Sequence, residues 1–145
     1  MNKKIDPAMH SAEHILNQTM VRLFDCGRCI SAHIERKKSK CDYQFDRDLS
    51  QEEVRDIEKR VNEIIQANLP LTEEWLSKDE AARRFQLDRV PEEAGEKIRI
   101  VKVGDYDACP CIGPHVGSTV DIGRFRITTT SCENGLLRIR FKLAR

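Results

Sequence analysis

The chain has 145 residues, of which 39% are hydrophobic and 34% charged, and its formal net charge is +1. This length suits one domain, so we assign residues 1–145 to a single domain. The small net charge excludes a general attraction to nucleic acid or membrane, so any RNA contact needs a local basic patch. No apolar run can span a bilayer, and the N-terminus lacks a secretory signal. We expect a cytoplasmic protein whose six cysteines are free or metal-bound.

The first part of the chain predicts a helix followed by a hairpin. Asp6-Pro7 is typical of a helix start, and Asp25-Cys26-Gly27 is typical of a helix end. Apolar residues between them follow helical spacing. Residues 29–35 and 41–47 alternate like two strands. The turn between these strands carries four basic residues, which are Arg36, Lys37, Lys38 and Lys40.

The second part predicts one more long helix and then mostly strands. Ser50 and Glu53 have the spacing of a capping box and open the helix, which Asn68-Leu69-Pro70 ends. We then expect a strand at 71–76, a small helix at 78–85, a loop at 86–96, and strands at 98–103, 125–130 and 137–143. Asn134-Gly135 is typical of a hairpin turn. This order predicts an α+β fold, with helices packed on one side of an antiparallel sheet.

Four potential metal ligands lie in two clusters about a hundred residues apart. His10 and His14 lie one helical turn apart and therefore share a face. Cys111 and His115 lie in a predicted loop at 107–115, whose glycine and prolines restrict the backbone. A set of one thiolate and three imidazoles suits tetrahedral zinc. We predict one zinc ion bound by these four residues.

Each cluster also has other interpretations. The histidines could flank a core-facing stripe, and the cysteine could be a small buried hydrophobe in a rigid turn. Residues 10–14 also match the inverted zinc-protease pattern, with Glu13 as general base and Glu92 or Glu93 as a third ligand. That interpretation leaves Cys111 and His115 without a role.

The remaining cysteines leave a second site open. Cys26 and Cys29 form a Cys-x-x-Cys pattern, and Cys109 lies two residues before Cys111. A second zinc site or a redox pair would use such thiols. The roles of Cys26, Cys29 and Cys109 are not determined by the sequence.

The paired motifs resemble the editing domain shared by alanyl- and threonyl-tRNA synthetases and by freestanding AlaX-type proteins. The resemblance rests on His-Ser-Ala-Glu-His-Ile-Leu at 10–16 and on Cys-Ile-Gly-Pro-His at 111–115, and it extends from about His10 to Leu143. The Gly-Pro-His sequence is closer to the threonyl form, whereas Ser118–Ile127 is closer to the alanyl form. The cognate tRNA therefore stays open.

The resemblance implies a hydrolase that deacylates mischarged aminoacyl-tRNA in trans, with seryl-tRNA(Ala) as the first choice and zinc as cofactor. Alternatives are a seryl-tRNA(Thr) hydrolase of the threonyl type and a non-catalytic, zinc-organised tRNA-binding module. The implied partner is a tRNA acceptor end carrying the wrong amino acid. ATP use is not expected, because the chain is too short for a synthetase core. The oligomeric state is not predicted.

Candidate residues for positioning the attacking water are Gln44 and Thr119, although both could be ordinary polar residues of a strand or loop. Zinc could be catalytic or structural, since four protein ligands make a closed shell. The basic turn at 36–40 is the first candidate for phosphate contacts. If it is only a solvated turn, the RNA-binding surface is expected among Arg124, Arg126, Arg138 and Arg140.

Overall fold

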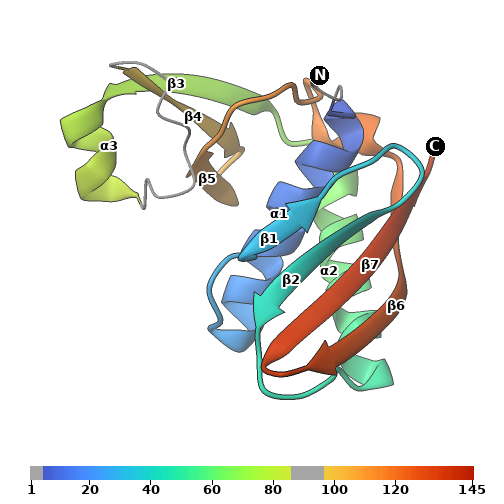
Figure 1. Ribbon diagram of the computed structural model, residues 1–145. Coiled ribbons are helices and arrows are strands. Elements are labelled where there is room, and N and C mark those ends of the chain that lie inside the picture. Colours follow the sequence, from blue (N-terminus) through green and yellow to red (C-terminus); the bar gives the residue numbers. More distant parts are fainter. Residues whose placement is uncertain (1–4, 86–96) are drawn as a thin grey trace.

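A computed structural model of the chain describes residues 5–85 and 97–145. The elements in chain order are α1 (Pro7–Phe24), β1 (Ser31–His33), β2 (Ser39–Gln44), α2 (Gln51–Gln66), β3 (Leu71–Ser77), α3 (Lys78–Arg84), β4 (Lys97–Val103), β5 (Asp107–Pro110), the 3-10 helix η2 (Thr119–Ile122), β6 (Arg124–Glu133) and β7 (Leu136–Ala144). They confirm the predicted α+β class. The strands divide between two antiparallel sheets (Figure 1). The assignment of residues 1–145 to one domain stays a prediction.

Both long helices begin where the sequence predicts. The Asp6 carboxylate accepts a hydrogen bond of 3.0 Å from the Met9 amide, and Pro7 occupies the first helical position of α1. In α2, the Ser50 hydroxyl accepts from the Glu53 amide while the Glu53 carboxylate accepts from the Ser50 amide. These reciprocal bonds satisfy amides that the first helical turn leaves without partners.

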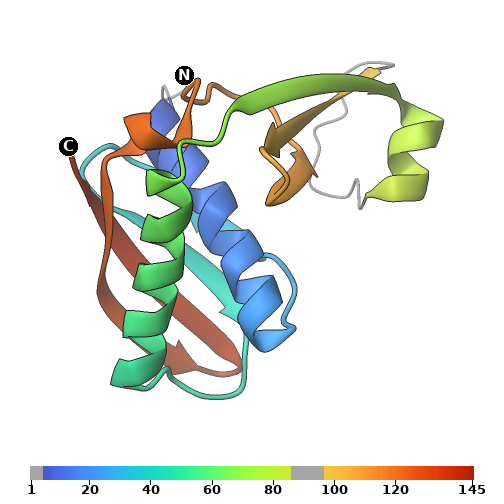
Figure 2. The same cartoon turned by 180° about the vertical axis from the view of Figure 1, so that it is seen from behind.

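The larger sheet has the strand order β1-β2-β7-β6. Helices α1 and α2 cover one of its faces (Figures 1 and 2). The predicted hairpin between β6 and β7 is confirmed: Asn134 and Gly135 have φ of 53° and 78°. Two consecutive residues with positive φ give a turn whose twist matches that of the paired strands.

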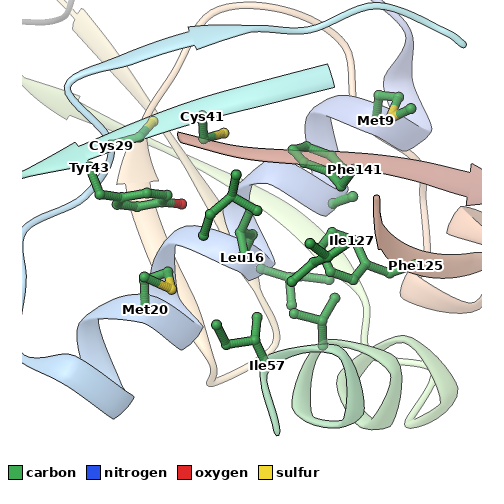
Figure 3. Packing of buried hydrophobic residues seen from close by; sticks show 14 of the residues in the cluster. Met9, Leu16, Met20, Cys29, Cys41, Tyr43, Ile57, Phe125, Ile127 and Phe141 are labelled. Atoms are coloured by element: carbon green, nitrogen blue, oxygen red, sulfur yellow. The ribbon is translucent and has the colours of Figure 1, made fainter. Parts of the chain in front are cut away.

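The main core fills the space between these helices and the larger sheet. Leu16 and Met20 of α1 pack there with Ile57 of α2 and with Phe125 and Phe141 of the sheet (Figure 3). All five side chains are less than 2% exposed. Burial of such side chains drives folding and fixes the position of α1 on the sheet.

The smaller sheet, with order β3-β4-β5, uses its two faces differently. Leu76 and Ile100 pack with Ala81 of α3 in a second, smaller core. Val101 and Cys109 are cross-strand partners on the opposite face, which turns toward α1. The sheet therefore presents its β5 edge to α1.

Two sequence predictions are wrong in detail. Strand β2 begins at Ser39, so Lys40 lies in a strand instead of the turn. The Ser39 hydroxyl donates to the Glu35 carbonyl and accepts from the Glu35 amide. These two bonds close the turn earlier than predicted. Asp107–Pro110, predicted as part of a loop, forms β5 because it pairs with β4. The predicted loop at 86–96 lies outside the described residues, as do Glu92 and Glu93.

Asp6 also joins distant parts of the chain. Its carboxylate lies 2.7 Å from the guanidinium of Arg145 and 3.1 Å from that of Arg36. Burial would raise the pKa of Asp6, but hydrogen bonds from Arg145 and from the Met9 amide lower it overall. The start of α1 and the end of β7 therefore lie side by side (Figure 1). Within the part of the chain that the structure describes, no helix is long and apolar enough to span a membrane.

Candidate metal centre

The four predicted ligands converge in space. One donor atom from each of His10, His14, Cys111 and His115 can be chosen so that all four lie within 4.8 Å of one another. His10 and His14 are buried, while Cys111 and His115 are partly exposed. The cluster therefore lies at the junction between the N-terminal half of α1 and the loop that follows β5.

Local backbone structure places the loop ligands. The Cys111 amide donates to the Arg99 carbonyl at 3.1 Å, which continues the β4–β5 pairing by one residue. Gly113 has φ of 117°, and a Cβ at that position would lie 3.1 Å from the His10 ring. Glycine thus supplies both the backbone conformation and the space for His10. The Arg99 guanidinium donates to the Gly113 carbonyl at 2.6 Å and fixes the loop against β4.

Hydrogen bonds at Nδ1 orient two of the imidazoles. Nδ1 of His10 lies 3.1 Å from the Pro114 carbonyl oxygen, so this nitrogen carries the proton and donates. Nδ1 of His115 lies 2.9 Å from the hydroxyl of Ser11. Nε2 of His10 and Nε2 of His115 then face the Cys111 thiol, at 3.4 and 3.2 Å. Such partners on the outer nitrogen are typical of metal-binding histidines.

The spacing of these donors suits zinc. With bond lengths of about 2.3 Å to sulfur and about 2.05 Å to nitrogen, two ligands of a tetrahedral ion lie about 3.6 Å apart. The observed separations of 3.2 and 3.4 Å between sulfur and nitrogen are close to that value. The donor set, three imidazoles and one thiol, is among those that zinc prefers. The residues present therefore fit the ion.

Burial and mutual proximity set the charge of the histidines. Burial, followed by the charge of His14, lowers the pKa of His10 to about 4 and that of His115 to about 2. Both rings are therefore neutral at neutral pH, which is the form that binds metal. For His14, burial acts to lower the pKa, but Cys109 and Asp107 outweigh it and raise that pKa well above its ordinary value.

Asp107 and Arg28 surround the outer side of His14. The Asp107 carboxylate lies 3.6 Å from Nδ1 of His14 and 2.6 Å from the Arg28 guanidinium. Burial would raise the pKa of Asp107, but His14 and Arg28 hold it far below its ordinary range. His14, Asp107 and Cys109 form a second group with metal-binding atoms. Arg28 also contacts the Cys109 sulfur at 3.4 Å, so its guanidinium already supplies the positive charge there.

A buried polar network adjoins the metal cluster, because the Glu13 carboxylate lies 4.0 Å from Nε2 of His10 and 4.0 Å from Nε2 of His14. Cys29 donates to the Glu13 carboxylate at 3.4 Å, and Asn17 donates to the same oxygen at 3.1 Å. The Tyr43 hydroxyl in turn donates to Asn17 at 2.7 Å. The sulfurs of Cys29 and Cys41 and a Glu13 oxygen lie within 4.8 Å of one another. Cys26 instead donates to the Met20 carbonyl at 3.7 Å, so the two thiols of the Cys-x-x-Cys pattern have different partners.

Comparison with known proteins shows which sequences this chain resembles. Residues 98–140 match the family described as the threonyl and alanyl tRNA synthetase second additional domain. The alanine–tRNA ligase of Coxiella burnetii (strain Dugway 5J108-111) is 33% identical over 134 residues, which cover 90% of this chain and 15% of that protein. The alanine–tRNA ligase of Archaeoglobus fulgidus is 34% identical over 142 residues, covering 91% of this chain and 15% of that protein.

The chain belongs to the second additional domain family of threonyl- and alanyl-tRNA synthetases. It spans about 15% of the length of these two alanine–tRNA ligases. The alanine–tRNA ligase of Treponema denticola, 30% identical, matches 92% of this chain over 22% of its own length.

Within the described residues, neither residue predicted to position water forms a hydrogen bond with a predicted metal ligand. Thr119 is fully buried; its hydroxyl donates to the carbonyls at the end of α2 and accepts from the Leu69 amide at 2.9 Å. Gln44 is exposed at the end of β2. Because Tyr43 faces α1, Gln44 points to the opposite face of the sheet. These contacts favour structural roles in this domain, and the catalytic roles stay predictions.

Ser11, Asp107 and Arg28, which contact the predicted ligands or their partners, were not predicted from the sequence. Ser11 lies within the first motif and Asp107 lies four residues before Cys111, so their positions offered a signal. Arg28 gave no such signal, because its contact with Asp107 joins residues 79 positions apart.

Proposed function

We propose that this domain is an aminoacyl-tRNA hydrolase that removes a wrongly attached amino acid, with seryl-tRNA(Ala) as its substrate. Its site is a zinc centre held by His10, His14, Cys111 and His115. One observation carries the proposal, namely the convergence of these four donors with Nε2 of His10 and His115 turned toward Cys111. The family relation supports tRNA as the partner.

Hydrolysis of the ester that joins the amino acid to the terminal ribose needs an activated water and a stabiliser for the developing oxyanion. A bound zinc ion lowers the pKa of a coordinated water and polarises a carbonyl group. The domain's own residues hold the ligands: the Pro114 carbonyl and the Ser11 hydroxyl orient His10 and His115, and Asp107 faces His14. Arg99 holds the loop that carries Cys111.

The physics of discrimination makes an editing site against serine feasible. Serine differs from alanine by one hydroxyl group. A site that hydrogen-bonds this hydroxyl binds alanine poorly, because its buried polar groups would lose their partners. Relatives that match about nine-tenths of the chain are alanine–tRNA ligases, which favours tRNA(Ala). The Gly-Pro-His sequence at 113–115 resembles the threonyl form, so seryl-tRNA(Thr) is the second candidate substrate.

The number of ligands favours one further candidate function. Four protein ligands are typical of a structural zinc site, whereas catalytic sites usually keep one position open. A domain with a closed shell would bind tRNA and zinc without hydrolysing the ester. We therefore keep a zinc-organised tRNA-binding module as the alternative.

The test combines metal content with deacylation. Purified protein is incubated with seryl-tRNA(Ala), seryl-tRNA(Thr) and the two correctly charged tRNAs, and the loss of amino acid is followed. We expect about one zinc per chain and rapid loss from seryl-tRNA(Ala) only. The Cys111→Ala variant should lose both zinc and activity. The matched control is Cys132→Ala, since Cys132 lies on β6 and donates to the Phe45 carbonyl.

Three results would change the assignment. Equal rates on both seryl-tRNAs would remove the preference for tRNA(Ala). Zinc binding without hydrolysis of either substrate would favour the binding module. Absence of zinc in protein purified without chelator, together with unchanged behaviour of Cys111→Ala, would refute the metal centre.

A further inference from the structure

We propose that the indole of Trp75 stacks on the unpaired 3′-terminal base of the tRNA acceptor end. The proposal rests on the function proposed above, since it assumes that the terminal ribose reaches the candidate metal centre. The base that stacks on Trp75 therefore belongs to the nucleotide whose ribose carries the amino acid.

Trp75 is unusually exposed. It is the only tryptophan of the chain and, at 58%, the most exposed large hydrophobic side chain among the described residues. Its neighbour Leu76 is 5% exposed and packs under α3. Successive residues of a strand point to opposite faces, so Trp75 lies on the face of the smaller sheet that is not covered by α3. An exposed tryptophan beside a candidate site is a common feature of recognition surfaces.

Strand register connects Trp75 with the metal centre. Trp75 on β3 pairs with Arg99 on β4, and the Arg99 carbonyl accepts from the amide of Cys111. The three residues therefore form a row across the sheet. Directly paired residues have side chains on one face. Neighbouring strands are about 4.8 Å apart, which places the backbone of Trp75 about 10 Å from that of Cys111. An aminoacylated nucleotide at the centre would extend along this row.

The charges along the row suit RNA. The Arg99 guanidinium is held by the Glu73 carboxylate and by the Gly113 carbonyl, so it lies beside Trp75 at a fixed position. Lys97 is exposed and lies two residues before Arg99, hence on the same face. Because Glu73 already binds Arg99, Lys97 is the candidate for pairing with a phosphate, and Arg99 positions the loop beside Trp75. An aromatic ring beside a cation is typical of surfaces that bind single-stranded nucleic acid, where bases stack and phosphates pair with cations.

Because Trp75 is the only tryptophan, fluorescence excited at a wavelength that the two tyrosines do not absorb reports on this side chain alone. The first experiment titrates the parent protein with an unacylated RNA hairpin that ends in an unpaired CCA sequence, and with the same hairpin lacking the terminal adenosine. We expect the complete hairpin to quench the fluorescence. The shortened hairpin should need at least about a fivefold higher concentration, because one stacked base contributes about a factor of 5 to 100.

The second experiment separates binding from chemistry. For seryl-tRNA deacylation, Trp75→Ala should raise KM about 5- to 100-fold and leave kcat within about twofold, since the indole does not touch the ester. Trp75→Phe retains an aromatic face and should recover most of the loss. Leu136→Ala is the control, because Leu136 is an exposed apolar residue of the other sheet.

The outcomes distinguish this proposal from the proposed function. Deacylation by the parent without quenching, at RNA concentrations that saturate the reaction, would overturn the role of Trp75 alone. Equal quenching by both hairpins would overturn the assignment to the terminal base. Quenching by the complete hairpin without any deacylation would support the stacking surface and refute the hydrolase. If Trp75→Ala fails to fold, the parent titration and Trp75→Phe still decide.

Discussion

The carboxylate of Asp107 lies 3.6 Å from Nδ1 of His14. Asp107 is itself held by Arg28 and by Gln18, whose side chains donate to it at 2.6 and 2.9 Å. A carboxylate behind a histidine fixes the ring's orientation and increases its basicity as a ligand. The α1 and β5 elements thus jointly determine how His14 is presented.

This relationship predicts the behaviour of an Asp107→Ala variant. We expect its dissociation constant for zinc to rise about 10- to 100-fold, because His14 loses the group that orients it. Competition with a chromophoric chelator measures the change. Asp46→Ala, at an exposed position after β2, is the control. An unchanged dissociation constant would show that Asp107 does not support a metal ligand.

Thr119 offers a separate test of structure against catalysis. Its hydroxyl joins η2 to the end of α2 through the carbonyls of Ile64 and Ile65 and the Leu69 amide. Thr119→Val removes these hydrogen bonds and should reduce the free energy of unfolding by about 1–3 kcal/mol. Urea denaturation measures the loss, and Thr119→Ser should restore most of it. A large fall in kcat with unchanged stability would instead support the predicted catalytic role.

The capping box of α2 predicts a pH dependence of stability. The Arg47 hydrogen bond, followed by the Ser50 amide, lowers the pKa of Glu53 from 4.5 to about 2. The folded state therefore favours the charged carboxylate. Its contribution is complete above pH 4.5 and is lost as the pH falls from 4.5 toward 2. Because the Arg47 pair is exposed, we expect only about 0.5 kcal/mol.

Urea denaturation of the parent and Glu53→Gln between pH 2 and 7 tests this dependence. The difference in unfolding free energy should shrink as the pH falls. Glu52→Gln is the control, because Glu52 takes no part in the capping box. A difference that stays constant across the range would contradict a role for the charge of Glu53.

The basic residues between positions 36 and 40 predict a salt effect on RNA binding. Replacing Arg36, Lys37, Lys38 and Lys40 with alanine should weaken tRNA binding, and each lost phosphate contact should lower the salt slope by about one. Because Arg36 also binds Asp6, Lys37→Ala with Lys38→Ala tests the charges without that structural contact. Zinc content should not change.

An unchanged salt slope would direct attention to another surface. A groove of about 910 Å³ between α2 and β6 is lined by several basic residues, including Arg55, Lys59, Arg124 and Arg126. Arg138 is a weaker candidate, because the Asp42 carboxylate already binds its guanidinium at 2.8 Å.

Local sequence signals predicted the elements that local interactions form. The Asp6 cap, the Ser50 capping box and the Asn134-Gly135 turn each join residues a few positions apart, and all are present. Strand β5 has no such signal, because Asp107–Pro110 contains a proline and depends on pairing with β4. The division of strands between two sheets likewise depends on partners that are distant in sequence.

For the candidate site, the sequence likewise predicted each local motif but not the packing that brings the motifs together. Helical spacing indicated that His10 and His14 share a face, and the restricted loop placed Cys111 with His115. Their convergence with one another requires β5 to lie against α1, which no short pattern encodes. The contacts of Asp107 with Arg28 and His14 arise only from that packing.

The ion pair between Asp6 and Arg145 joins two positions 139 residues apart in the chain. A unit whose first helix and last strand meet at one point can be inserted into a surface loop of a host protein with little separation of the host's flanking residues. The same geometry makes the fold a suitable starting point for circular permutation: a short linker between residues 5 and 145, with new ends at the Asn134-Gly135 turn, should preserve both helix caps and the metal ligands.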